Sequence, residues 1–133
     1  MHLVPVRAKE LRYAIELTAA GELRDENGVP LEVPAEWSAE HLLLAALVRC
    51  SLDSFAYHAR RAGHEVSASG SAHGTITKQG EDGRYRFVEI DVSIDAQLTP
   101  RTNEVDDLIA KAERDCFVSA SLTIKPEYTW RVS

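Results

Sequence analysis

Apolar and polar residues alternate along the second half of the chain, and this period of two predicts β-strands. The stretch YRFVEIDVSIDAQL at 85–98 shows the alternation most clearly, with one apolar face and one acidic or polar face. The small-residue stretch at 66–77 predicts a strand that pairs with it as a hairpin. A last strand is predicted at 121–132, where Pro126 indicates an edge strand or a bulge because it has no N–H to donate. The predicted apolar face of the strand at 85–98 comprises Val88, Ile90, Val92, Ile94, Ala96 and Leu98.

A shorter hairpin is predicted near the N-terminus. Residues 12–18 (RYAIELT) alternate between apolar and polar positions, which favours a strand. Asn27-Gly28 is a hairpin turn signal, and Leu31 and Val33 suit a second short strand. The predicted hairpin precedes the longest apolar stretch of the chain.

That apolar stretch predicts one long helix over 39–62. Ser38 suits its N-cap, Glu40 in the first turn complements the helix dipole, and Gly63 follows two arginines as a C-terminal stop. A helix of this length extends about 36 Å. Its middle, LLLAALV, is apolar nearly all round and must be enclosed on every side. One sheet cannot enclose it, so we infer a partner subunit.

A second helix is predicted within TPRTNEVDDLIAKAERDC, with Thr102 or Asn103 as its cap and Cys116 at or just after its end. The predicted order is therefore ββ–α–ββ–α–β, and this interleaving of strands and helices favours an α+β fold. A length of 133 residues fits a single domain over 1–133.

Composition and charge narrow the classes of partner. The chain is 44% hydrophobic and 27% charged, as a globular protein is, and its net charge of −6 argues against nucleic acid or an anionic membrane. The N-terminus lacks the features of a signal peptide, and no run of about 18 apolar residues predicts a membrane span. These observations predict a cytoplasmic protein, in which thiols are normally reduced.

The chain has two cysteines, Cys50 in the long apolar helix and Cys116 after the second helix. They do not form a CxxC motif, and two cysteines do not make a structural zinc site. No histidine pair has the i,i+4 spacing of a metal site, so neither a metal nor another cofactor is predicted. From position alone, both cysteines fit small buried side chains in the core.

Neighbours in the sequence give Cys50 little activation. Arg49 precedes it, but adjacent residues on a helix point about 100° apart. Glu40 lies ten residues earlier, about 15 Å along the axis, which is too far for contact within one helix. Cys116 heads the segment CFVSASL, and a cysteine at the start of a short turn or helix can be stabilised as a thiolate.

Taken together, SAEHLLLAALVRCSLDSFAYHARRAGHEV, the long alternating strand and LIAKAERDCFVSASL resemble the OsmC/Ohr family of osmotically inducible and organic hydroperoxide resistance proteins. Members carry one cysteine late in a PExLLLAALxxC helix and a second in an AexxCPVsxsL segment. The likeness extends from about Pro34 to Ser133. Ala39 and Phe117 replace prolines of the family pattern, and neither change removes a reactive atom.

The resemblance implies an intertwined homodimer, with long central helices wrapped by antiparallel sheets. It also implies a thiol peroxidase in which Cys50 is peroxidatic and Cys116 is resolving. Glu40 matches the acidic residue of the motif. Arg24 is the candidate for the family's active-site arginine, but GELRDENG matches poorly, and Arg12 and Arg7 remain alternatives.

The chemistry implied by the resemblance suits these residue types. A cation lowers the pKa of a thiol, and a carboxylate such as Glu40 can hold a guanidinium by a bidentate pair. The substrate would be an organic hydroperoxide or hydrogen peroxide, and an external thiol or dithiol would reduce the resulting disulfide. The alternative is a non-catalytic dimer of the same fold that binds a small apolar ligand or acts in stress protection.

Overall fold

The computed structural model describes residues 8–133, which fall into two compact units on either side of Ser38. The first unit holds three short strands, and the second begins at Ala39 and holds all the described helices. In chain order the elements are β1 (Ile15–Leu17), β2 (Leu23–Asp25), β3 (Pro30–Leu31), α1 (Ala39–Arg61), β4 (Glu65–Lys78), β5 (Tyr85–Thr99), α2 (Val105–Arg114), α3 (Phe117–Ser121) and β6 (Glu127–Val132).

The first unit is an antiparallel sheet in the order β1-β2-β3, so the prediction of two N-terminal strands was incomplete. An additional reversal joins β1 to β2. There Thr18 Oγ1 accepts a hydrogen bond from the Glu22 N–H at 3.1 Å, and Gly21 adopts a φ of 86°. The predicted Asn27-Gly28 turn is present, but it joins β2 to β3. None of residues 8–38 is buried, so the described part of this unit has no core of its own.

The second unit begins with the long helix α1, whose predicted extent is confirmed to within one residue. Gly63 ends it with a φ of 91°, a backbone conformation that favours glycine. Its N–H donates to the carbonyl of Arg60 at 3.0 Å, and the N–H of His64 donates to Ala59 at 3.0 Å. These bonds satisfy carbonyls that the last turn leaves without helical partners.

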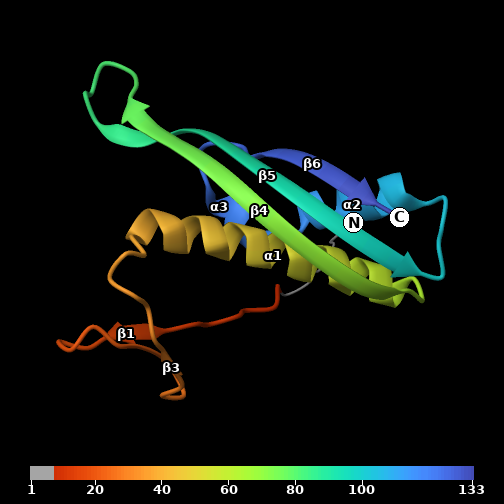
Figure 1. Ribbon diagram of the computed structural model, residues 1–133, viewed down its shortest axis with the longest axis horizontal. Coiled ribbons are helices and arrows are strands. Elements are labelled where there is room, and N and C mark those ends of the chain that lie inside the picture. Colours follow the sequence, from red (N-terminus) through yellow and green to blue (C-terminus); the bar gives the residue numbers. More distant parts are fainter. Residues whose placement is uncertain (1–7) are drawn as a thin grey trace, which may run out of the picture. The chain divides into compact units, whose positions relative to one another are not determined.

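The sheet of the second unit has the order β4-β5-β6, with β4 antiparallel and β6 parallel to β5 (Figure 1). The prediction of wholly antiparallel sheets was therefore wrong for this pair. The reason is the connection: α2 and α3 lie between β5 and β6 and return the chain to the same end of the sheet, as parallel strands require. β6 is an edge strand of this sheet, as Pro126 predicts.

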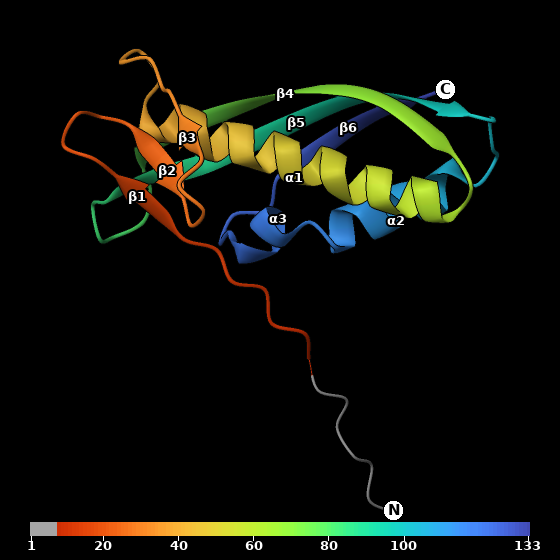
Figure 2. The same ribbon diagram turned by 90° about the horizontal axis from the view of Figure 1, so that it is seen from below.

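The helices pack on one face of this sheet, which Figure 2 shows from below. One buried cluster joins Phe55 of α1 and Leu108 of α2 to the inner face of β5. The apolar row predicted for β5 is confirmed from Ile90 to Leu98, where each member is at most 4% exposed. Val88 was wrongly included. The register shifts opposite Thr75 and Ile76, and this bulge leaves Val88 without a partner and turns Phe87 into the core instead.

Two glycines on the inner face of β4 allow α1 to approach closely. A Cβ atom at Gly70 would stand 3.0 Å from Val48 Cγ1 of α1. One at Gly74 would stand 3.3 Å from Leu44 Cδ2 of α1 and 2.5 Å from the ring of Phe87 in β5. Real Cβ atoms essentially never come within 3.0 Å, so the ring would have to move. The weak strand propensity of 66–77 therefore has a packing reason.

In the described part of the chain, α1 is the one helix whose length and mean hydropathy, 1.2 over 18 residues, would let it cross a membrane. This measure is weak evidence, because the core helix of a globular domain meets it too. The sequence prediction of no membrane span rested on the absence of an uninterrupted apolar run, which is a stricter measure.

Candidate functional site

The two cysteines lie together on the inner face of the sheet. Cys50 is in the middle of α1 and is partly exposed, whereas Cys116 precedes α3 and is 0% exposed. Both belong to the same apolar cluster, which includes Leu47, Ile90 and Val92. Both thiols are free, and the Cys116 thiol is close enough to Cys50 to contribute to the raised pKa of Cys50.

The surroundings of Cys50 disfavour its thiolate. Burial raises the pKa of the Cys50 thiol, hydrogen bonds from the Val118 and Phe117 N–H groups oppose the rise, and the neighbouring thiol of Cys116 adds to it. No arginine or lysine of residues 8–133 stands among the leading causes. Burial, two backbone N–H groups and the neighbouring thiol are therefore the main influences on the Cys50 pKa.

Hydroxyl groups adjoin the buried sulfur of Cys116. Ser51 Oγ lies 3.6 Å from Cys116 Sγ and 2.9 Å from the hydroxyl of Tyr128, and it donates to the carbonyl of Leu47 at 2.8 Å. Tyr128 also interacts with Ser119 and with Cys116 itself. The sulfur thus has polar neighbours in an otherwise apolar cluster.

Two further hydrogen bonds tie α1 to the segment that carries Cys116. Ser54 Oγ donates to the carbonyl of Ala112 at 2.8 Å, and His58 Nε2 lies 2.8 Å from a carboxylate oxygen of Asp115. Arg114 and His58 hold the pKa of Asp115 at about 2, with the hydrogen bond from Arg114 the larger cause. The residue before Cys116 is therefore fixed to α1 two turns beyond Cys50.

The other predicted site residues lie in the first turn of α1, in the first unit or outside the described residues. Glu40 is in the first turn of α1, ten residues before Cys50. Arg24 is in β2 of the first unit, where it forms an ion pair with Glu22. Arg12 forms an ion pair with Glu10, and Arg7 lies outside the described residues. The structure thus brings the two predicted cysteines together within the second unit.

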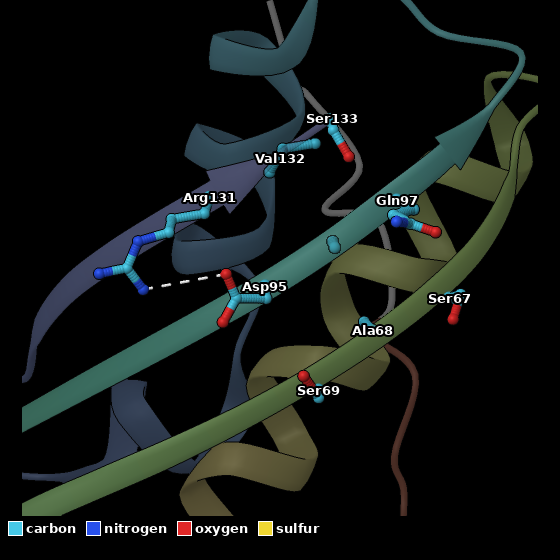
Figure 3. A pocket seen from close by; sticks show the side chains of 9 residues that line it. Ser67, Ala68, Ser69, Asp95, Gln97, Arg131, Val132 and Ser133 are labelled. Atoms are coloured by element: carbon cyan, nitrogen blue, oxygen red, sulfur yellow. Dashed lines mark ion pairs between the residues drawn. The ribbon is translucent and has the colours of Figure 1, made fainter.

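A shallow groove of about 530 Å³ marks the opposite, polar face of the sheet (Figure 3). It is bordered by Ser67 and Ser69 of β4, Asp95 and Gln97 of β5, and Arg131 of β6. The Arg131 guanidinium lies 3.8 Å from Asp95 Oδ1. Neither cysteine lines this groove, so the candidate chemistry belongs to the helix-covered face. Among the described residues, no group of three or more His, Cys, Asp or Glu side chains is arranged to hold a metal ion.

Sequence reasoning missed the roles of Ser51 and Tyr128. Ser51 is a polar residue within an apolar helix, and Tyr128 falls on the alternating face of the last strand. These positions indicate the roles of the two hydroxyls only weakly. Their meeting at Cys116 depends on the parallel pairing of β6, which places Tyr128 opposite Val92.

Tyr128 gives the fold an alkaline sensitivity. Burial is the main cause that raises the pKa of its phenol, so the unfolded chain should lose this proton first as the pH increases. The resulting stability is complete below the unfolded pKa of about 10 and should be lost as the pH rises through the folded value. Urea unfolding between pH 8 and pH 11 should show a falling free energy of unfolding, and the fall should be smaller in Tyr128→Phe.

Tyr85→Phe is the matched control, because the Tyr85 ring is 69% exposed. It should retain the alkaline slope of the wild type. Equal slopes in the wild type and Tyr128→Phe would contradict the prediction.

Comparisons with known proteins agree with the fold of this chain. The sequence profile of the family described as OsmC-like protein matches residues 33–131. An OsmC-like protein from Mycoplasma pneumoniae has a TM-score of 0.68 at 15% identity, over 95% of this chain and 99% of that one. An organic hydroperoxide resistance protein from Elizabethkingia anophelis has a TM-score of 0.65 at 20% identity, over 96% and 99%.

A third similar structure is an organic hydroperoxide resistance protein from Legionella pneumophila, with a TM-score of 0.61 at 20% identity over 95% of this chain and 99% of that one. No curated protein matches the chain significantly. These matches confirm the predicted fold, and at such identities the structural likeness concerns the fold alone.

Proposed function

The chain belongs to the OsmC-like protein family, and we propose that it is a thiol-dependent peroxidase that reduces organic hydroperoxides. The observation that carries the proposal is the contact between Cys50 and Cys116, two sulfurs that come from distant parts of the chain. Their unequal exposure supports different roles: the partly exposed Cys50 meets the peroxide, and the buried Cys116 resolves the product. Two of the similar structures are named organic hydroperoxide resistance proteins.

The proposed reaction has three steps. The Cys50 thiolate attacks the O–O bond, which leaves a sulfenic acid on Cys50 and releases the alkoxide as an alcohol after protonation. Cys116 then attacks the sulfenic sulfur, so that an S–S bond forms, the S–O bond breaks and water departs. An external thiol or dithiol, available in the cytoplasm where we place the protein, reduces the disulfide by thiol exchange.

The first step requires a nearby cation that lowers the pKa of Cys50. Because burial raises the pKa of Cys50, its thiolate would be scarce at pH 7. We propose that Arg24 supplies the positive charge and that Glu40 holds its guanidinium, as the family resemblance implies. Arg24 and Cys50 belong to different units of the chain, so the arginine can come from the same subunit or from a partner.

A homodimer forms part of the proposal. Of the 23 residues of α1, only Leu47, Ser51, Ser54, Phe55 and Ala59 are buried, although the middle of the helix is apolar. The described part of the first unit has no buried residue at all. Both features leave apolar surface that a second copy could cover.

A single-turnover titration tests the proposed activity. One equivalent of cumene hydroperoxide added to the reduced protein should remove both free thiols per chain, because each peroxide oxidises Cys50 and Cys116 to one disulfide. Cys116→Ser should lose a single thiol and retain a sulfenic acid that dimedone labels. Wild-type protein that keeps both thiols under these conditions would refute the peroxidase function.

Charge removal should identify the activating arginine. Arg24→Ala should raise the pKa of Cys50 and slow its alkylation by iodoacetamide at pH 7 by roughly tenfold for each pKa unit. Arg12→Ala and Arg7→Ala are matched controls, because each removes one arginine from the same N-terminal region. The pH profile of alkylation, measured in a Cys116→Ser background, distinguishes the three. A shift in one of the controls in place of Arg24→Ala would assign the role to that arginine.

One observation favours the non-catalytic alternative. The raised pKa of Cys50 is typical of an inert, buried thiol. If Cys50 keeps an alkylation pKa above the free value of about 8.5 in the intact protein, a dimer that binds a small apolar ligand becomes the better description.

A further inference from the structure

The buried sulfur of Cys116 faces two hydroxyl groups. Ser51 Oγ lies 3.6 Å from the sulfur, and its oxygen is 2.9 Å from the Tyr128 hydroxyl, which interacts with the same sulfur. Ser51 is 1% exposed and Cys116 is 0% exposed. A hydroxyl can accept a hydrogen bond from a thiol or donate one to a thiolate. The change from acceptor to donor requires only rotation about the C–O bond.

This versatility matters for the resolving step. A thiol attacks another sulfur as the thiolate, and a buried anion is costly unless it is hydrogen-bonded. The other buried side chains of the cluster that holds Cys116 are apolar, Leu47 and Ile94 among them, and cannot donate a hydrogen bond. Ser51 now donates to the Leu47 carbonyl at 2.8 Å, so rotation of its O–H bond would redirect the hydrogen to the sulfur.

We propose that the hydroxyls of Ser51 and Tyr128 stabilise the Cys116 thiolate while it attacks oxidised Cys50, an inference that rests on the proposed function. In this step the Cys116 proton leaves, the new S–S bond forms and the S–O bond of Cys50 breaks. The departing hydroxide takes up a proton to become water, so atoms and charge balance. Ser51 lies directly beside the reacting sulfur, and Tyr128 is hydrogen-bonded to Ser51 and packs against the same cluster.

Ellman's reagent tests the inference without any peroxide. The partly exposed thiol of Cys50 should react first to form a mixed disulfide and release one thionitrobenzoate, at a rate that depends on reagent concentration. Cys116 should then displace the second thionitrobenzoate in a concentration-independent phase, which reports the resolving attack alone. In Ser51→Ala and in Tyr128→Phe this second phase should slow by roughly tenfold or more, the size expected for a lost hydrogen bond to an anion.

Ser54→Ala is the matched control, because Ser54 is a second buried serine one turn along α1 that bonds to the Ala112 carbonyl. It should leave the second phase within about twofold of the wild type. The pH profile of the second phase should move to higher pH in Ser51→Ala and Tyr128→Phe but not in Ser54→Ala. A purely structural role would slow all three variants without moving the profile.

Three results would overturn the inference. The second phase could keep its wild-type rate in both hydroxyl variants, it could slow equally in Ser54→Ala, or the wild type could show no first phase at Cys50. Failure of the peroxidase proposal is recognised separately, since the wild type would then show both phases with Ellman's reagent yet keep its thiols in the presence of cumene hydroperoxide.

Discussion

Cys50→Ser is expected to consume cumene hydroperoxide no faster than the dithiol reductant does alone. A serine hydroxyl is not ionised at neutral pH and cannot be oxidised to a sulfenic acid, so the variant loses the nucleophile itself. The loss relative to the wild type should be on the order of 1,000-fold or more. Peroxide remaining after fixed times with dithiothreitol in excess measures it.

Cys116→Ser is the matched control for this result. It removes the other sulfur of the same contact but keeps Cys50, so its first turnover should proceed at the wild-type rate. Later turnovers should slow, and sulfinic acid should accumulate on Cys50 because resolution is lost. Equal and slow clearance by the wild type and Cys50→Ser would refute the enzymatic function.

Phe55→Ala should have the largest effect on stability. Phe55 of α1 is 0% exposed and packs against α2 and β5. The centre of its ring lies 5.3 Å from that of Trp130. Removing a fully buried ring leaves a cavity, and such changes lower the free energy of unfolding by about 3–5 kcal/mol. Urea denaturation followed by far-ultraviolet circular dichroism measures the change.

Tyr85→Ala provides the comparison for Phe55→Ala. Its ring is 69% exposed at the start of β5 and lies 5.3 Å from the Lys78 ammonium. A loss of less than about 1 kcal/mol is expected, since exposed cation–π contacts contribute little. Losses of equal size in the two variants would contradict the assignment of Phe55 to the core.

Sequence patterns predicted the elements whose signals are local. The extent of α1 follows from an apolar stretch that ends at Gly63, and the inner row of β5 follows from strict alternation. The contact between Cys50 and Cys116 was suggested by resemblance to a family. Spacing could not supply it, because 65 residues and several elements separate the second sulfur from the first.

The features that the sequence did not predict depend on pairing between distant strands. The parallel register of β6 brings Tyr128 to Cys116, and no local pattern encodes that register. The bulge at Val88 did have a local signal, because the consecutive apolar residues Phe87 and Val88 interrupt the alternation. In the first unit, Thr18 and Gly21 form a turn without a strong dipeptide signal, so the middle strand, β2, was missed.

The glycines of β4 influence the distance between the two sulfurs. Cys50 lies on α1, the helix that packs against Gly70 and Gly74, whereas Cys116 packs among residues of β5. A bulkier residue at Gly70 would press against Val48 of α1 and shift the helix that carries Cys50. The spacing between α1 and β4, which the missing side chain at Gly70 permits, therefore influences how closely the two sulfurs approach.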